Sequence, residues 1–224
     1  MPEAKDRVTA AKLQHVYDRI APDWYGLRHH SRFTTELKEL AGRWQSGRLL
    51  NLGCGQGADF QPFKGSFGLH GVDFSPEMIK QAQRYARKYG FEAKLTVADA
   101  GNLPYPADYF DSAIAVAIYH HIEGDRARLA ALEELRRVLK PGGQAFVTVW
   151  NRWQPRFWFS RHEVMVPWRQ RGENLYRYYH LFSYHELENL ISEAGFSVIR
   201  SHPESGYRLP INAFSHNICL LAKK

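Results

Sequence analysis

The sequence predicts an α/β domain built on a mainly parallel β-sheet. Along residues 45–150, apolar runs that suit buried strands alternate with segments of helical periodicity. The first run ends in a glycine-rich turn, Gly53 to Gly57, and the second ends in an acid, Asp73, 20 residues after Gly53. This order of strand, glycine turn, helix, strand and carboxylate is how α/β proteins hold the ribose of a nucleoside.

The N-terminal part of the chain, residues 1–44, is predicted to be a helical arm. Apolar periodicity indicates helices over Ala10–Ala21 and Thr34–Trp44. A short turn joins the two helices and contains Gly26, His29 and His30.

The glycine turn favours a nucleoside that carries no polyphosphate. Its G-x-G-x-G spacing matches neither the lysine-bearing phosphate loop nor the full dinucleotide motif. Glycines let the backbone approach a ligand closely, and Asp73 can accept hydrogen bonds from both ribose hydroxyls. The ligand contacts predicted in this part of the chain are Gly53, Cys54, Gly55, Gly57, Asp73 and Phe74.

The next elements continue the alternation. Ser75 is the predicted cap of a helix over Met78–Tyr89, with proline in its first turn. A third strand, about Glu92 to Ala98, leads into Asp99 and Ala100, where a carboxylate can accept a hydrogen bond from an adenine amino group. The nearly continuous apolar run from Phe110 to Ile118 is typical of a strand buried on both faces.

Two more segments complete the predicted core. An amphipathic helix over Glu123–Leu139 is expected to stop at the turn Pro141-Gly142-Gly143, and a fifth strand follows over Gln144–Trp150. After residues 151–182, Ser183 is expected to cap a helix that runs to Ala194. Two last strands, Phe196–Ser201 and Ala213–Ala222, are predicted to pair antiparallel at one edge of the sheet.

Composition limits the function classes. A chain of 224 residues with 44% hydrophobic residues can bury one core, so we expect a single domain. No apolar stretch long enough to span a bilayer and no signal-peptide pattern occurs, so no membrane association is expected and the predicted location is cytoplasmic. Two cysteines, Cys54 and Cys219, are too few for a disulfide scaffold or a zinc cluster, and no metal site is predicted.

Residues 151–182 form an insertion with a distinct composition. The formal net charge of the chain is +7, and this segment holds six arginines and nine aromatic residues against two acids. Arginine interleaved with aromatic rings suits single-stranded RNA, because guanidinium groups contact phosphates and rings stack on unpaired bases. The alternative is a lid over the active site with its own small aromatic core, and the two roles can coexist.

The core motifs resemble those of the class I S-adenosylmethionine-dependent methyltransferases. Glycine loop, ribose acid, adenine-side acid and Pro-Gly-Gly turn occur in the family's order over residues 45–150. The resemblance implies a Rossmann-like seven-stranded fold, with a helical arm (1–44), a cofactor-binding core (45–150), a lid insertion between the fifth and sixth strands (151–182) and a C-terminal helix and strands (183–224). One departure is Asn51, where members usually carry an acid. An amide there can still orient the amino end of the ligand, without charge attraction.

A closer resemblance covers most of residues 14–200. The segments that carry it are Tyr17-Asp18-Arg19-Ile20-Ala21, Arg28, Ala117-Ile118-Tyr119-His120-His121, Val166-Pro167-Trp168 and Arg177-Tyr178-Tyr179-His180-Leu181-Phe182. They are similar to the tRNA wobble-uridine methyltransferases, which esterify the carboxylate of 5-carboxymethyluridine in the anticodon loop. The resemblance implies S-adenosyl-L-methionine as cofactor, the tRNA anticodon loop as partner and a small zinc-bearing activator subunit.

Methylation of a carboxylate needs alignment and a clamp for the second oxygen, but no general base, because the carboxylate is already ionised. The candidates for catalysis are Arg28, His120, His121 and Arg177, with Ala117 placed beside the cofactor. Two other functions stay open: a small-molecule methyltransferase of the quinone-biosynthesis type, which shares the paired histidines, and a catalytically silent adenosyl-binding subunit, suggested by Asn51.

Overall fold

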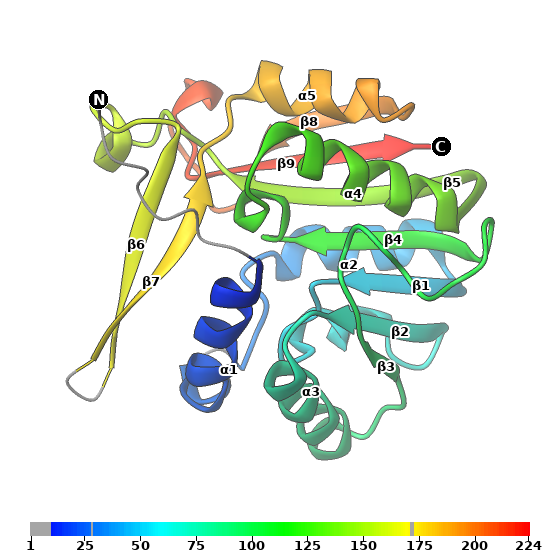
Figure 1. Cartoon of the computed structure of the whole chain (residues 1–224). Helices are drawn as coiled ribbons and strands as arrows, with labels where there is room; N and C mark the ends of the chain where they lie inside the picture. The colour runs from blue at the N-terminus through cyan, green and yellow to red at the C-terminus, as the bar shows by residue number, and fades with distance from the viewer. Residues whose placement is uncertain (1–9, 28, 171–172) are drawn as a thin grey trace.

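The computed structural model of the protein describes residues 10–27, 29–170 and 173–224. Its centre is a seven-stranded sheet in the order β3-β2-β1-β4-β5-β9-β8 (Figure 1). The first five strands run parallel, and β9 lies antiparallel between β5 and β8. The strands are β1 (Gly47–Leu52), β2 (Phe67–Asp73), β3 (Lys94–Val97), β4 (Phe110–Val116), β5 (Leu139–Trp150), β8 (Ser197–Pro203) and β9 (Asn217–Lys223).

Helices cover both faces of this sheet. They are α1 (Ala10–Leu27), α2 (Thr34–Trp44), α3 (Pro76–Tyr89), α4 (Asp125–Val138) and α5 (Tyr184–Glu193). Short 3₁₀ helices lie at η1 (Ala58–Phe63), η2 (Tyr119–His121), η3 (Pro155–Phe157) and η4 (Asn212–Phe214). None of the helices in the described part of the chain is both long enough and apolar enough to cross a membrane.

The molecule has a hydrophobic core on each face of the sheet, because the side chains of a strand point alternately to the two faces. Leu50 and Leu52 pack with α4 and α5 residues such as Leu135, whereas Leu49 packs with Leu37 of α2 and with η1 on the opposite face. All of these leucines are nearly inaccessible to solvent. Each buried side chain of this size contributes roughly 1.5–3 kcal/mol, so both helical layers hold the sheet and fix the positions of its strand ends.

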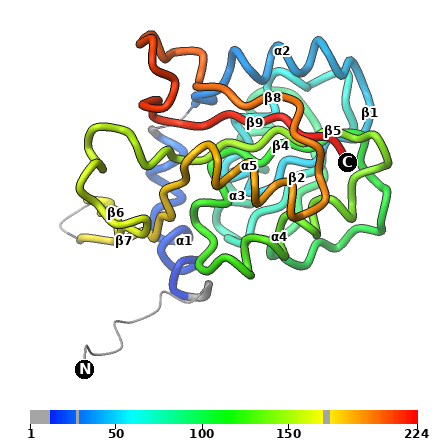
Figure 2. The backbone as a smooth tube through the Cα atoms, turned by 90° about the horizontal axis from the view of Figure 1, so that it is seen from above, coloured from blue at the N-terminus to red at the C-terminus, as the bar shows by residue number. Residues whose placement is uncertain are grey.

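The insertion after β5 contains a separate antiparallel hairpin, β6 (Glu163–Gln170) and β7 (Glu173–His180). The hairpin lies beside α1 and outside the main sheet in both views (Figures 1 and 2). The rings of Trp24 in α1 and Trp168 in β6 lie 5.3 Å apart, which links the two elements. The insertion therefore sits between the fifth strand and the last two strands, where the sequence places it.

Three local predictions are wrong. Helix α1 continues through Gly26, so no turn begins there. The segment after the glycine loop is a six-residue 3₁₀ helix and not a regular α-helix; it contains Pro62, which has no N–H for a helical hydrogen bond. The Pro141–Gly143 segment lies inside β5, where the pairing with β4 is irregular, and is not a turn between α4 and the strand.

Candidate active site

A cavity of about 470 Å³ opens at the carboxyl ends of the parallel strands. Residues after β1, β2, β4 and β5 form its floor, and α1 forms one wall. In open α/β sheets this edge is the usual ligand site, and the volume is in the range of small-molecule sites.

The glycine loop needs its glycines at the cavity wall. Gly53 and Gly55 have positive φ angles of 65° and 51°. A Cβ atom added at Gly53 would lie 2.8 Å from Cδ1 of Ile118. The loop is therefore in a conformation that other residues rarely adopt, and its Gly55 N–H donates to the acid at the end of β2.

Backbone N–H groups hold both carboxylate oxygens of Asp73 in place. Its Oδ2 atom accepts a hydrogen bond from the Gly55 N–H at 2.8 Å, and its Oδ1 atom accepts one from the Ser75 N–H at 2.9 Å. Each oxygen keeps a further lone pair for a ligand hydroxyl. Burial raises the pKa of Asp73 to about 6, although the two backbone hydrogen bonds oppose the shift.

Gln56 is a cavity residue that the sequence analysis missed. It is 3% exposed and lines the cavity, and neither Nε2 nor Oε1 has a hydrogen-bond partner within the described ranges. Buried amides normally form hydrogen bonds, so this side chain has capacity for a polar ligand group. Its position inside the glycine loop was the only available signal.

The end of β4 brings two histidines to the cavity through η2. The Nδ1 atom of His120 accepts a hydrogen bond from the Trp150 N–H at 3.1 Å. In neutral His120 the proton is therefore on Nε2, which makes Nε2–H a donor. Burial lowers the pKa of His120 well below its ordinary value, and His121 and Arg177 lower it further.

His121 has a different hydrogen-bond pattern. Its Nδ1 atom lies 2.9 Å from the carbonyl oxygen of Tyr178, and its Nε2 atom lies 2.7 Å from the hydroxyl of Tyr17. The carbonyl can only accept, so Nδ1 carries the proton and Nε2 accepts from Tyr17. Burial lowers the pKa of His121 to about 3. Neither histidine thus keeps a free lone pair that could serve as a base.

Helix α1 closes the cavity with aromatic side chains. The ring of Tyr17 lies 5.6 Å from that of Phe74 and 6.2 Å from that of Trp24. Asp18 ties this helix to the start of α3, since its Oδ1 atom accepts a hydrogen bond from the Ser75 hydroxyl at 2.6 Å. The arm is therefore part of the site rather than an appendage.

Most of the predicted site residues meet at this cavity. Its lining includes Gly53, Cys54, Gly55, Asp73, Phe74, Asp99, Ala100, Ala117, His120 and His121. Ala117 has a positive φ angle of 59°, which is unusual for a residue other than glycine and indicates a constrained backbone beside the cavity. Trp150 and Tyr179 also line the cavity and were not predicted as site residues.

Three of the described site candidates are not among the residues that line the cavity. Asn51 is fully buried, and neither polar atom of its amide has a hydrogen-bond partner within the described residues, so its contact with a ligand stays a prediction. Gly57 forms the left-handed N-cap of η1. Arg177 is buried beside the lining residue Tyr179, and Arg28 falls outside the described residues.

Arg177 occupies an aromatic enclosure next to the site. Its guanidinium carbon lies 5.0 Å from the ring centre of Trp168, 5.4 Å from that of Tyr179 and 5.8 Å from that of Trp24. The side chain is 6% exposed, and its Nε atom has no hydrogen-bond partner in the described part of the chain. Burial raises the pKa of Tyr17, and both the charge of Arg177 and a side-chain hydrogen bond from Arg177 oppose this shift.

Outside the cavity, one group of side chains has the chemistry of metal ligands. His162, His180 and Glu186 each bring one ligand atom, all within 4.8 Å of one another. Arg152 hydrogen-bonds to His162 Nε2, and its positive charge opposes a divalent cation at this point. Glu186 also completes the capping box with Ser183. We explain the group as an ion pair that joins the hairpin to α5.

A methyltransferase domain family matches residues 49–143. A protein of Encephalitozoon cuniculi named as a methyltransferase is 31% identical over 159 residues, which cover 67% of this chain and 70% of the relative. The chain belongs to the class I S-adenosylmethionine-dependent methyltransferases.

Two relatives that cover most of this methyltransferase are named as tRNA methyltransferases. The Schizosaccharomyces pombe tRNA (carboxymethyluridine(34)-5-O)-methyltransferase is 28% identical over 220 residues, which cover 87% of this chain and 91% of the relative. The human protein named probable tRNA methyltransferase 9B is 29% identical over 210 residues, which cover 92% of this chain. The chain spans only 42% of the length of that human relative.

Solved structures share the fold of this methyltransferase at low identity. The Burkholderia thailandensis 1,6-didemethyltoxoflavin-N1-methyltransferase has a TM-score of 0.72 at 19% identity and covers 100% of this chain and 92% of its own. A chain of the complex between the Haloferax volcanii Trm112 methyltransferase activator and a methyltransferase has a TM-score of 0.68 at 18% identity, with coverage of 94% and 96%.

The cavity fits the methyl donor of this class. The glycine loop leaves room for close backbone approach, Asp73 has free acceptor capacity, and the amide of Gln56 is buried with no partner in the part of the chain that the structure describes. These three features match a ligand with a ribose and a charged amino acid end.

Proposed function

We propose that this methyltransferase transfers a methyl group from S-adenosylmethionine to the carboxylate of 5-carboxymethyluridine at the wobble position of tRNA. The name of the S. pombe relative supplies the substrate class. The single observation that carries the proposal is the state of the two histidines: both are neutral, and both basic nitrogens already accept hydrogen bonds. Such a pair suits a nucleophile that is ionised before it binds.

The cofactor is proposed to lie along the carboxyl ends of β1, β2 and β4. Asp73 would accept hydrogen bonds from the ribose hydroxyls and Asp99 one from the adenine amino group. Gly53 and Gly55 would give the backbone contact, and Gln56 would bind the amino acid end. Cys54, Phe74, Ala100 and Ala117 would contribute packing around the ligand.

Bound S-adenosylmethionine would supply an electrophilic methyl group on a sulfonium. A carboxylate oxygen would bond to the methyl carbon as the carbon–sulfur bond breaks, the neutral thioether would leave, and no proton would have to be removed. The protein's own groups then have two tasks, alignment and exclusion of water. His120 can donate from Nε2–H to the substrate carboxylate. Tyr17 and His121 hold α1 over the cavity through their mutual hydrogen bond, which shields the site from solvent.

Two arginines are proposed to attract the substrate. Arg177 lies close enough to affect Tyr17 and both histidines electrostatically. The positive charge of a buried arginine beside the cavity favours binding of an anionic group there. Arg28 is proposed as a second contact, to the carboxylate or to a phosphate. We further propose that the insertion, residues 151–182, covers the bound nucleotide as a lid.

The test uses the purified chain, S-adenosylmethionine and an RNA hairpin that contains 5-carboxymethyluridine. We expect a methyl ester that mass analysis of nucleosides detects and that mild alkali removes. The same hairpin with uridine in place of the modified base should stay unmethylated, because it lacks the ionised nucleophile. Methylation of a quinol hydroxyl, with no reaction on the hairpin, would instead support the small-molecule alternative.

The experiment also tests the alternative that the chain is a catalytically silent adenosyl-binding subunit. Calorimetry shows whether the chain binds S-adenosylmethionine, and the hairpin assay shows whether it transfers the methyl group. Cofactor binding without methyl transfer, even with an activator present, would contradict an enzymatic role.

We also propose a small activator subunit as partner. The support is the likeness to a methyltransferase chain whose complex with the H. volcanii Trm112 activator has been solved. The proposed docking site is the free edge of β3.

A further inference from the structure

We propose that two surface segments next to the cavity form a stacking platform for the unpaired nucleotides that flank the methylated one. The platform consists of Trp153, Trp158 and Phe159 from the insertion and Leu209, Ile211 and Phe214 from the β8–β9 connection. It deepens the proposed function, because it names the surface on which single-stranded RNA lies outside the cavity.

The first observation is exposure. Phe159 is fully exposed at 101%, Trp158 is 50% exposed and Trp153 is 41% exposed. Leu209 and Ile211, on the second segment, are 64% and 54% exposed. Large apolar side chains exposed together mark binding surfaces in soluble proteins, because their exposure to water is unfavourable.

The second observation joins the two segments. The ring of Trp158 lies 5.9 Å from the ring of Phe214, so the insertion and the β8–β9 connection meet in space. The indole N–H of Trp158 donates to the carbonyl oxygen of Trp153 at 2.7 Å. This hydrogen bond fixes the ring orientation and leaves its face available for stacking.

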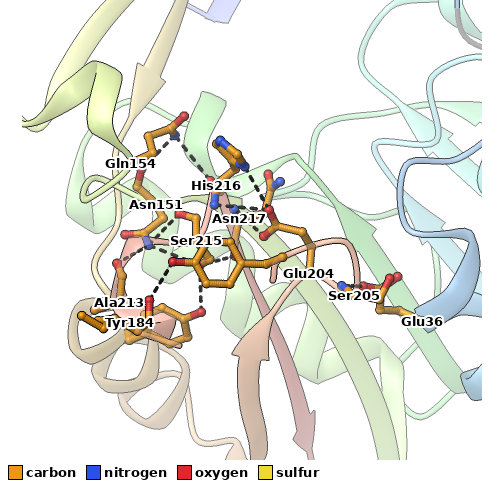
Figure 3. A network of polar contacts seen from close by, with 12 residues as sticks. Glu36, Asn151, Gln154, Tyr184, Glu204, Ser205, Ala213, Ser215, His216 and Asn217 are labelled. Carbon is orange, nitrogen blue, oxygen red and sulfur yellow. Dashed lines mark hydrogen bonds and ion pairs between the residues drawn. The ribbon is translucent and has the colours of Figure 1, made fainter. Parts of the chain in front are cut away.

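A buried polar network holds this arrangement (Figure 3). The amide of Asn151, fully buried, donates to the carbonyl oxygens of Ala213 at 2.7 Å and Ser215 at 2.9 Å. Glu204 accepts hydrogen bonds from the backbone N–H groups of His216 and Asn217 at 3.3 and 2.8 Å. The network fixes both ends of the connection, so the platform is formed before any ligand binds.

The platform is continuous with the cavity. Trp150 lines the cavity, and its ring lies 5.9 Å from that of Phe157, which directly precedes Trp158. Asn217, at the other end of the polar network, also lines the cavity. A strand whose central base enters the cavity therefore meets aromatic side chains as it leaves.

Charge identifies the occupant as RNA. Residues 151–162 and 205–214 contain four arginines and no Asp or Glu. The guanidinium of Arg156 lies over the rings of Phe157 and Trp150, at 4.2 and 4.6 Å, and that of Arg152 lies 4.6 Å from the ring centre of Trp153. Aromatic rings can stack on RNA bases while the arginines contact the phosphates, and such stacking does not depend on the base sequence.

The test measures equilibrium binding of a fluorescently labelled, unmodified single-stranded oligoribonucleotide. Trp158→Ala and Phe159→Ala should each weaken binding about fivefold or more, the range expected when one stacked base is lost. Arg156→Ala should weaken binding and lower its salt dependence by about one phosphate contact. Ile199→Ala, 41% exposed on β8, and Arg87→Ala, exposed on α3, are the matched controls and should bind like the wild type.

The outcomes separate this proposal from the proposed function. Oligonucleotide binding needs no methyl transfer, so a wild-type chain that binds but does not methylate would support the platform alone. Variants that bind like the wild type, while the wild type methylates the modified hairpin, would overturn the platform alone. A change in self-association at unchanged RNA affinity would also overturn it and would assign the surface to a second copy of the chain. Each variant's melting curve shows whether it is folded.

Discussion

We expect cofactor binding to depend most on Asp73. Asp73→Ala would remove the proposed charge-assisted acceptor for two ribose hydroxyls, each hydrogen bond being worth roughly 1.5–3 kcal/mol. We expect S-adenosylmethionine affinity to fall at least about tenfold by calorimetry. Glu39→Gln, a change on the surface, is the control. Unchanged affinity in folded Asp73→Ala would remove this residue from the site.

The same carboxylate sets a pH dependence. Because burial raises its pKa to about 6, Asp73 is mostly ionised at pH 7.5 and becomes protonated as the pH falls through 6. Cofactor affinity should therefore drop as the pH is lowered from 7.5 to 5. In Asp73→Asn this drop should disappear, and a drop that persists would mean that another group titrates.

Histidine burial predicts that folding stability also falls as the pH is lowered. An unfolded histidine titrates near 6.5, whereas the pKa of His121 is lowered to about 3 and that of His120 also falls well below its usual value. Below pH 6.5 these histidines are protonated in the unfolded chain but stay neutral in the folded chain, so the free energy of unfolding decreases as the pH falls. At pH 5 this amounts to roughly 1–2 kcal/mol per histidine. His121→Asn should flatten the dependence of the urea midpoint on pH between 7 and 5.

Asp73 itself changes stability in the other direction. Its pKa is raised on folding, so its contribution is most favourable below the unfolded value and is lost as the pH rises through about 6. The two histidines outnumber it, and net destabilisation by acid is expected. A stability that rises steadily from pH 7 to 5 would contradict the lowered pKa of the two histidines.

Asn51 is the position at which the chain departs from the family's usual acid. The sequence predicts a ligand contact there, and in the structure Asn51 is fully buried, is not among the cavity-lining residues, and has no partner for either polar side-chain atom within the described residues. Asn51→Asp would bury an unpaired charge. We expect a lower melting temperature rather than tighter cofactor binding, and tighter binding at equal stability would contradict this.

At the scale of elements, the hairpin and α1 act as one cover through Arg177. Arg177→Ala removes the cation between Trp24 and Trp168, a contact worth roughly 0.5–2 kcal/mol when desolvated. Amide hydrogen exchange in β6 and β7 should speed up, and methylation should fall while cofactor affinity stays nearly the same. Lysine should restore activity only in part. Arg169→Ala, exposed on β6, is the control. Unchanged exchange would exclude a structural role for Arg177.

Elements with strong local signals were predictable. Helix α2 has its predicted bounds, and Ser183 forms the expected capping box. The hairpin was not predicted as two strands, because the residues on both of its faces are apolar or aromatic, so the sequence does not alternate between apolar and polar residues. Val164 and Val166 are half-buried, whereas Met165 between them is exposed although it is also apolar. Its paired state depends on tertiary contacts with α1, which the sequence pattern does not encode.

The site was predictable to the extent that it follows from strand ends. Glycine loop, Asp73, Asp99 and the histidines lie at carboxyl ends of parallel strands, and the topology brings such ends together. Gln56 could not be predicted, because its role depends on the lack of a protein partner for its amide. Tyr179 could not be predicted as a wall residue either, because it comes from an insertion whose position the core motifs do not determine.

At the scale of the whole molecule, the sheet has two different edges. The β8 edge is formed by an antiparallel strand, whereas β3, at the other edge, has four residues and, among the described strands, pairs with β2 alone. Val97 in β3 is 47% exposed. Free backbone groups beside an exposed apolar side chain favour addition of a strand from another chain. This edge is therefore the proposed docking site of the activator.

The prediction is that a Trm112-type activator from the same source forms a complex with this methyltransferase through β3. Co-expression should give one species of higher mass on sizing, with more soluble protein and higher activity than the chain alone. Val97→Lys should abolish the complex, because a charged edge opposes strand addition. Val198→Lys on β8, where the native residue is 36% exposed, is the matched control and should leave the complex intact. A complex that tolerates Val97→Lys would move the interface elsewhere, and full activity of the chain alone without any complex would contradict an activator.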